Sequence, residues 1–152
     1  MNDKYGCAIL LQTQNGKTQP ENITINDSVL CSDNNYHKVS YIKKHKPTKL
    51  LSVRGFWFNR ILVNPETKLL VTPRNNASMN NARYINAADL IGLKDYYICM
   101  LANTWNGVMD DAVYEGQYAW VPFSVVTTDI VESTYEIYTT DNAHVIINQC
   151  IF

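Results

Sequence analysis

The chain has 152 residues, of which 46% are apolar and 18% charged, and its formal net charge is −1. This composition is that of one globular domain and excludes a disordered chain, and the near-neutral charge gives no electrostatic basis for binding nucleic acid. No run approaches the roughly 18 apolar residues of a membrane span, and the first residues contain no apolar signal region. We therefore expect an intracellular protein, monomeric, with neither nucleic acid nor a membrane as its partner.

Short apolar or alternating stretches recur along the chain between residues that favour turns, and this pattern predicts an all-β domain of many short strands. The expected strands are, in chain order, residues 8–13, 28–32, 38–42, 50–53, 60–63, 68–72, 96–101, 120–127, 134–139 and 144–148. Turns are expected at residues 14–17 and 32–35. Residues 86–90 are the best helical candidate, of one or two turns at most, and residues 107–116 are expected to form a long loop.

Four cysteines, Cys7, Cys31, Cys99 and Cys150, lie far apart and include no C-x-x-C pair. This spacing argues against a zinc site and against a dense disulfide framework, so we expect free thiols and no metal. Cys31 and Cys99 lie in apolar, strand-like surroundings, which favours a role as small buried hydrophobes. Cys7 and Cys150 differ from them because each lies a few residues from one end of the sequence.

Four further segments are more informative in their order than singly. Residues 23–33 read I-T-I-N-D-S-V-L-C-S-D, and residues 63–71 read V-N-P-E-T-K-L-L-V. Residues 84–96 read Y-I-N-A-A-D-L-I-G-L-K-D-Y, and residues 134–139 read T-Y-E-I-Y-T. In this order they resemble the motifs of inteins, the protein-splicing elements of the Hint class, over nearly the whole chain. The corresponding intein patterns are a G-D-x-V turn, T-P-x-H-x-L-L-V, W-x-x-A-x-D-L-x-x-G-D-Y and T-Y-D-L-x-V.

The resemblance implies the horseshoe-like, all-β Hint fold and autocatalytic protein splicing in cis. Residues 7–149 would be the splicing domain, and residues 1–6 and 150–152 its flanking segments. Cys7 would be the first nucleophile, Cys150 the second, and Gln149 the side chain that cyclises to cut the second junction. The chemistry would need no cofactor, and each molecule would react once. The sequence leaves no room for an endonuclease, so the resemblance is to a mini-intein.

The sequence departs from the intein pattern at three places. Thr67 stands where the second motif carries a histidine, and Asn64 replaces the usual threonine of that motif. Asn148 stands where the penultimate residue is usually histidine, and Glu136 replaces an aspartate. Thr67 can hydrogen-bond the scissile amide, but it cannot donate a proton as histidine does near neutral pH. His144 is either the histidine of the final motif or a residue that only starts a strand.

The remaining histidines, His37 and His45, are expected to be exposed loop residues, although either could serve as a substitute base. Removing residues 7–149 would join N-D-K-Y-G to C-I-F, a seam similar to the N-S-x-Y-G motif of family B DNA polymerases. The flanking segments, from such a polymerase, would then be the partner of the splicing domain.

Two alternative functions remain open on the sequence alone. One is a Hint domain that cleaves itself without ligation, and the competent residue at position 150 argues against it. The other is an inert β-barrel binding module, such as a phage or virion protein. That second alternative explains the composition, but it explains neither the paired terminal cysteines nor the polymerase-like seam.

Overall fold

The computed structural model describes residues 11–58, 60–102, 110–142, 146–147 and 150–151. This part of the chain contains strands and short 3-10 helices, and the prediction of an all-β fold is confirmed. The strands are β1 (Leu11–Thr13), β2 (Gly16–Thr18), β3 (Ser28–Leu30), β4 (Tyr36–Lys44), β5 (Thr48–Gly55), β6 (Ile61–Val63), β7 (Lys68–Pro73), β8 (Arg83–Asn86), β9 (Tyr96–Leu101), β10 (Val113–Glu115), β11 (Tyr118–Glu132), β12 (Tyr135–Thr139), β13 (Ile146–Ile147) and β14 (Cys150–Ile151). The 3-10 helices are η1 (Pro20–Asn22), η2 (Arg74–Asn76), η3 (Met79–Asn81) and η4 (Ala87–Leu90).

The observed elements differ in part from the expected ones, and the strands β2 and β8 were not expected. The expected long loop at residues 107–116 is wrong at its end, because Val113–Glu115 forms β10 and pairs with the start of β11. The helical candidate at residues 86–90 is present as the single 3-10 turn η4. Both outcomes depend on partners that lie elsewhere in the chain, since Ala87 of η4 donates its N–H to the carbonyl of Thr67 at 2.8 Å.

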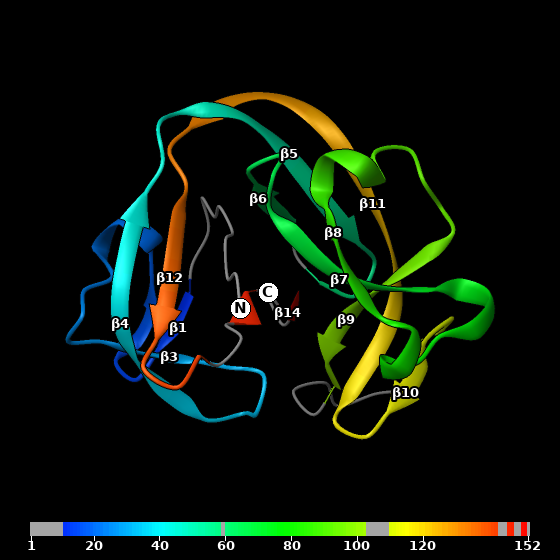
Figure 1. Cartoon of the computed structure of the whole chain (residues 1–152), viewed down its shortest axis with the longest axis horizontal. Coiled ribbons are helices and arrows are strands. Elements are labelled where there is room, and N and C mark those ends of the chain that lie inside the picture. The colour runs from blue at the N-terminus through cyan, green and yellow to red at the C-terminus, as the bar shows by residue number, and fades with distance from the viewer. Residues whose placement is uncertain (1–10, 59, 103–109, 143–145, 148–149, 152) are drawn as a thin grey trace.

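The named strands form one antiparallel, hydrogen-bonded sheet that curls into two lobes (Figure 1). Its path runs β12-β4-β3-β1-β13-β14-β9-β11-β5-β6, with β2 on β1, β10 on β11, β7 on β9, and β8 on the far side of β7. One lobe holds β12, β4, β3 and β1, and the other holds β9, β11, β5 and β6. The pair β13 and β14 therefore links the two lobes, and β14 lies between them in Figure 1.

The long strands β5 and β11 pass over the top of the horseshoe (Figure 1). The first part of β11 pairs with β9, from Tyr118 to Pro122, and the second part pairs with β5 from Phe123 onward. Gly55 ends β5 beneath the ring of Phe58, and a Cβ at this position would lie 2.1 Å from that ring. Glycine is therefore required where β5 turns back toward β6.

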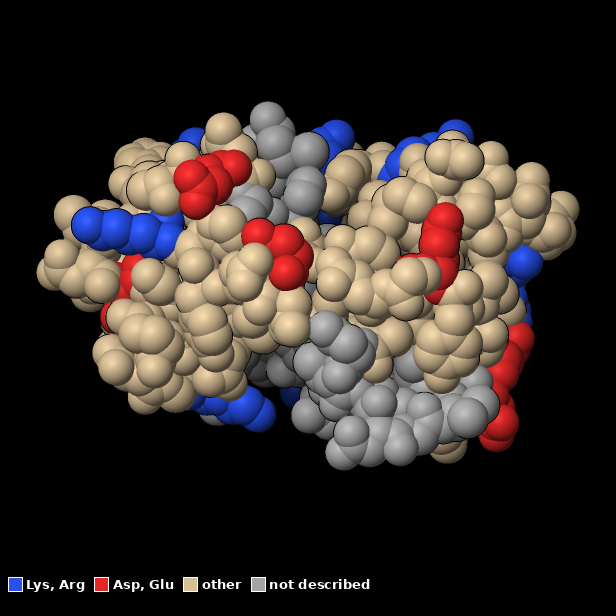
Figure 2. Space-filling view, turned by 90° about the horizontal axis from the view of Figure 1, so that it is seen from below, with Lys and Arg blue, Asp and Glu red and all other residues tan. Residues whose placement is uncertain are grey.

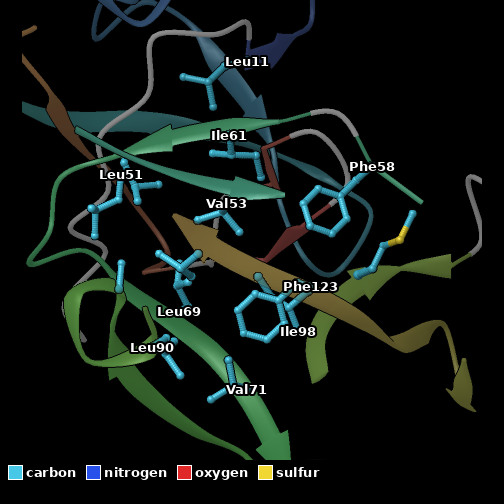
Figure 3. Packing of buried hydrophobic residues seen from close by; sticks show 14 of the residues in the cluster. Leu11, Leu51, Val53, Phe58, Ile61, Leu69, Val71, Leu90, Ile98 and Phe123 are labelled. Atoms are coloured by element: carbon cyan, nitrogen blue, oxygen red, sulfur yellow. The ribbon is translucent and has the colours of Figure 1, made fainter. Parts of the chain in front are cut away.

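The larger core cluster packs around β5, β6, β7, β9 and β11 (Figure 3), and it extends to Leu11, Val29, Val39 and Ile137 of the other lobe. Val53, Ile61, Leu69 and Ile98 are fully buried there. Fully burying such a side chain contributes about 1.5–3 kcal/mol, so this apolar layer is the main stabilising term of the lobe. Within the described residues, no helix has the length and apolar content that crossing a membrane needs. On the face shown in Figure 2, acidic and basic side chains are scattered, and neither charge gathers into a patch.

Removing β14 should leave the edge of β9 around Met100 without a pairing partner. Met100 pairs with Cys150 on this edge, whereas Tyr96, Tyr97 and Ile98 pair with β7. In a chain that ends at Gln149, the amides beside Met100 should lose protection from hydrogen exchange, and those beside Ile98 should keep it. Residue-resolved exchange, compared with the full chain carrying Cys7→Ala and Gln149→Ala, measures the difference. Equal protection beside Met100 in the two chains would show that β14 does not hold this edge.

Candidate functional site

The register of the terminal strands places Leu11 and Cys150 on either side of one strand, β13. Ile147 in β13 is the pairing partner of Leu11 in β1 and also of Cys150 in β14. Because neighbouring strands lie about 4.8 Å apart, the backbones of Leu11 and Cys150 are separated by only about 10 Å. Cys150 also pairs with Met100, so it lies on a strand held from both sides.

Four of the predicted site residues, Cys7, His144, Asn148 and Gln149, lie outside the described residues. Their neighbours in sequence are nevertheless placed by the strand pairing. Leu11 follows Cys7 by four positions, and Asn148 and Gln149 are the two residues that connect β13 to β14. The predicted junctions therefore adjoin strands that pair with one common partner, β13.

Asn64 and Thr67 form the turn between β6 and β7. The side-chain oxygen of Asn64 accepts the N–H of Glu66 at 2.9 Å, and its carbonyl accepts the N–H of Thr67 at 2.9 Å. This arrangement is an Asx turn, which explains why asparagine suits the first position. The Asn64 side-chain oxygen is thereby engaged in holding the turn that carries Thr67.

Thr67 is fully buried, and its hydroxyl makes no hydrogen bond to any residue that the structure describes. Burying a hydroxyl without a hydrogen-bond partner destabilises the fold by about 1–3 kcal/mol. Such a hydroxyl is therefore expected to have a functional role or a partner outside the described residues. A threonine hydroxyl can donate one hydrogen bond and accept others. Thr67 therefore offers a hydrogen bond to an amide, and it offers no titrating group.

Glu136 in β12 is buried and held by side chains from two strands. Its Oε1 accepts the hydroxyl of Tyr138 at 2.6 Å, and its Oε2 lies 2.6 Å from Nε2 of His45 and 3.9 Å from Nζ of Lys43. The side chain of Glu136 is only 6% exposed. Such short bonds to a buried carboxylate fix its position closely.

Sequence reasoning missed the role of His45, which was expected to be an exposed loop residue. The residue does lie in the connection after β4, but its side chain is only 18% exposed because it packs against Glu136. The pairing of Glu136 with Lys43 places the two elements side by side, and the N–H of His45 donates to the carbonyl of Thr134 at 2.8 Å. The only sequence signal for this contact would have been the register of β4 with β12.

The two cysteines with described side chains are unsuited to nucleophilic chemistry. Cys31 and Cys99 are both fully buried, which confirms the prediction that they are small core residues. Burial, with a smaller contribution from the charge of Glu115, raises the pKa of Cys99 to about 12. Because the thiolate is the reactive form, Cys99 is inert near neutral pH.

No group of His, Cys, Asp and Glu side chains among the described residues is arranged to hold a metal ion. The turn that carries Thr67 precedes β7 beside β9, whereas Glu136 lies on β12 in the other lobe. The two candidate groups therefore lie on opposite sides of the β13–β14 pair (Figure 1). Thr67 could supply one hydrogen bond, and Glu136 carries a buried carboxylate whose two oxygens are engaged by Tyr138 and His45.

The chain matches no family model and no curated protein. Its structure is similar to solved intein structures along almost its whole length. The crystal structure of the gp41-1 intein is 17% identical, with a TM-score of 0.63 over 97% of this chain and 95% of that one. The Ssp DnaB mini-intein variant M86 is 11% identical, with a TM-score of 0.70 over 99% and 94% of the two chains.

A DnaB intein from Synechocystis sp. PCC 6803 gives the same TM-score of 0.70 at 9% identity, over 97% of this chain and 96% of that one. Identities this low demonstrate a shared fold and no more. The chain therefore has the Hint fold of inteins, and the expected fold class is confirmed.

Replacing Thr67 by valine should leave the stability of the fold unchanged or raise it by up to about 1 kcal/mol, because the lost hydroxyl has no partner among the described residues. Thr13 provides the matched control. It is 1% exposed, and its hydroxyl donates to the carbonyl of Gly16 at 2.7 Å. Thr13→Val should lose about 1–3 kcal/mol. Urea denaturation of both variants measures the difference, and an equal loss in Thr67→Val would show that its hydroxyl is well bonded.

Proposed function

We propose that this chain is a protein-splicing domain, a mini-intein that excises residues 7–149 in cis and joins residues 1–6 to residues 150–152. The observation that carries the proposal is the common pairing of Leu11 and Cys150 with Ile147. Splicing requires the thiol at the second junction to attack the acyl group of the first. The pairing register places the strands that follow these junctions, β1 and β14, within about 10 Å of each other. The Hint fold and its similarity to intein structures support the same function.

The proposed reaction is a series of acyl transfers. The thiol of Cys7 adds to the carbonyl carbon of Gly6, the C–N bond breaks, and the thiol proton passes to the freed amine of Cys7. The thiol of Cys150 then takes over the acyl group and restores the thiol of Cys7. The side-chain amide nitrogen of Gln149 attacks its own main-chain carbonyl and expels the amine of Cys150 as a glutarimide closes. That amine finally takes the acyl group from its own sulfur, which leaves a Gly6–Cys150 peptide bond.

The described residues would assist this sequence by hydrogen bonding. A free thiol has a pKa of about 8.5 and the amine leaves poorly, so the first step needs help at the Gly6–Cys7 peptide. We assign that help to the hydroxyl of Thr67, presented by the Asn64 turn. Glu136, fixed by His45 and Tyr138, would orient the reacting groups from the other lobe.

Two further assignments complete the proposed site. Asn148 would hydrogen-bond the carbonyl of Gln149, and His144 would start the segment that leads to it. The flanking residues, N-D-K-Y-G and C-I-F, would belong to a family B DNA polymerase, to which the excision would restore an uninterrupted motif. The splicing domain would act on these flanks as a monomer inside the cell.

Cys7 should form a thioester that external nucleophiles can cleave. In a precursor with longer flanks, millimolar thiol or hydroxylamine should release the upstream segment. Cys7→Ala should abolish the release, because Cys31 and Cys99 are buried and, in the proposed scheme, Cys150 takes the acyl group only from the thioester of Cys7. The intact mass of the products after incubation in reducing buffer at neutral pH is the measurement.

Cys31→Ala is the matched control, since it should cost only packing, on the order of 1 kcal/mol, and should leave the release intact. Release that persists in Cys7→Ala would refute the assignment of Cys7. Release of both flanks without a joined Gly6–Cys150 product would indicate a self-cleaving domain, and an unchanged mass would indicate a binding module.

Gln149 should make resolution of the branched intermediate the slow step. Its side chain closes a six-membered ring and has one more torsion to freeze than asparagine, which costs roughly 0.5–1 kcal/mol. A base-labile, slowly migrating species should therefore accumulate on gels. Gln149→Asn should speed its resolution, and Gln149→Ala should stop it. A ligated product from Gln149→Ala would show that another group cuts this bond.

A further inference from the structure

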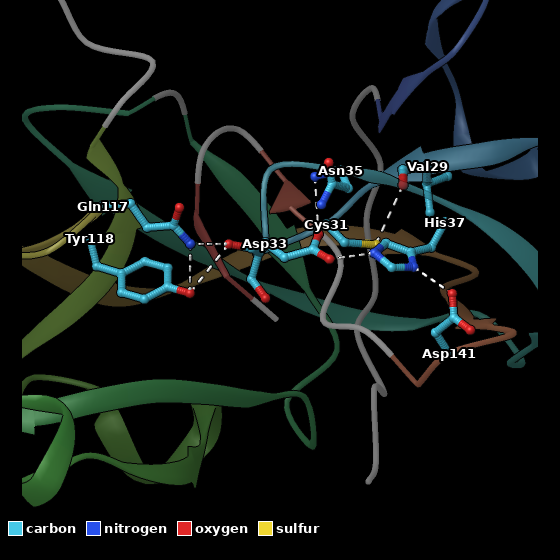
Figure 4. Close-up of polar contacts among 9 residues, drawn as sticks. Val29, Cys31, Asp33, Asn35, His37, Gln117, Tyr118 and Asp141 are labelled. Carbon is cyan, nitrogen blue, oxygen red and sulfur yellow. Dashed lines mark hydrogen bonds and ion pairs between the residues drawn. The ribbon is translucent and has the colours of Figure 1, made fainter.

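His37 is held between two aspartates that come from distant parts of the chain (Figure 4). Its Nε2 lies 2.6 Å from an oxygen of Asp33, and its Nδ1 lies 2.7 Å from an oxygen of Asp141. The side chain of His37 is 15% exposed, whereas those of Asp33 and Asp141 are 47% and 66% exposed. The expectation that His37 is an exposed loop residue is therefore wrong, because it lies in β4 and both of its ring nitrogens are engaged.

The Asp33 side of this cluster is firmly anchored. The N–H of Asn35 donates to the carboxylate of Asp33 at 3.0 Å within the turn between β3 and β4. The neighbouring carbonyl of Ser32 accepts the side-chain amide of Gln117 at 3.0 Å and the hydroxyl of Tyr118 at 3.3 Å (Figure 4). Gln117 and Tyr118 belong to the opposite lobe, so this turn is fixed to both halves of the horseshoe.

The Asp141 side leads directly to the proposed second junction. Asp141 follows β12, and β13 begins at Ile146, five positions later. The main chain before it is tied to β4 by a hydrogen bond from Thr140 to Lys38 at 2.9 Å. After it, Asn142 has a positive φ of 54° and donates its N–H to the carbonyl of Thr139 at 3.2 Å. The contact with His37 therefore fixes the tip of a turn from which the chain proceeds toward Gln149.

Both bonds of His37 can exist fully only when its ring is protonated. A neutral imidazole has one N–H, so its other nitrogen would present a lone pair to a carboxylate oxygen less than 3 Å away. The hydrogen bonds to Asp141 and Asp33 raise the pKa of His37, and burial opposes them less strongly. Burial raises the pKa of Asp33, but its hydrogen bonds from His37 and Asn35 outweigh this effect and lower it overall.

The charged surroundings of His37 do not reverse this conclusion. Lys38 follows His37 in β4, so its side chain points to the opposite face of the sheet. The residue of β3 that pairs with His37 is the apolar Val29. The thiol of Cys31 donates to the carbonyl of Val29 at 3.4 Å. Among the described residues, the two aspartates are thus the anions that govern the protonation of this ring.

We propose that protonated His37 is a positioning residue that latches the segment after β12 to the β3–β4 turn and so holds the Gln149–Cys150 junction in place for cleavage. The inference rests on the proposed splicing function. Because the folded pKa of His37 is raised, the latch is complete below the ordinary histidine pKa of about 6.5 and is lost as the pH rises through the higher folded value. Cleavage at the second junction should weaken over the same range, and the first acyl transfer should not.

The latch itself can be tested without any splicing. In a chain carrying Cys7→Ala and Gln149→Ala, NMR should show the His37 ring and the amides of Thr140 and Asn142 titrating with one midpoint above 6.5. Asp141→Asn removes one anion and should lower that midpoint by about 1 unit. Asp129→Asn is the matched control, since Asp129 is fully exposed and lies 3.7 Å from Lys49. Amides that do not follow the His37 ring, or a midpoint unmoved by Asp141→Asn, would overturn the latch.

The positioning role is tested separately by the pH profile of cleavage. In a chain carrying only Cys7→Ala, the rate of release after Gln149 should fall several-fold through the His37 midpoint, and Asp141→Asn should move this fall to lower pH. His37→Gln, which does not titrate, should remove the dependence. A chain that cleaves with a profile independent of His37 would overturn the positioning role. A chain that never cleaves would contradict the splicing function and leave the NMR result to decide on the latch.

Discussion

The pairing of β13 with β14 is the interaction on which the rest of the structure depends. These two short strands stand between β1 and β9 in the sheet, so the hydrogen-bonded path from one lobe to the other passes through them. Apart from the contacts of β1 with β13 and of β9 with β14, the other strands of that path pair within their own lobe. The sheet of this chain therefore closes around β13 and β14, and in the proposed function closing the sheet would also align the two junctions.

The candidate site around this closure combines a buried hydroxyl with a buried carboxylate that is held by hydrogen bonds. Thr67 takes the position of a histidine and presents a buried hydroxyl, and Glu136 is restrained on both oxygens by Tyr138 and His45. Groups held in this way lose little entropy when they meet a reacting peptide, which is the advantage of preorganisation. In the proposed scheme Thr67 would donate a hydrogen bond but no proton, so departure of the leaving group would be the demanding part of the first cleavage.

Much of the fold could be predicted from the sequence because period-2 apolar patterns report directly on half-buried strands. The strands at residues 68–72 and 96–101 appear almost as expected, and the 3-10 turn η4 corresponds to the expected short helix. At the candidate site, a motif singled out Asn64 and Thr67, but the turn that they form was not predicted. The contacts of His45 and His37 were not predicted either, because they join residues 91 and 104 positions apart and depend on strand register.

The position of β14 also gives the proposed reaction a direction. Cys150 and Ile151 form β14, yet in the splicing scheme both belong to the flank that leaves. Cleavage after Gln149 would thus detach the strand that pairs with Met100, and β9 and β13 would each lose a partner. Without β14 the sheet would no longer hold the two junctions close to each other. The excised domain would therefore not readily catalyse the reverse reaction. The pairing of β14 with β13 and β9, which would align the junctions in the precursor, would thus be lost on excision, and excision would be effectively irreversible.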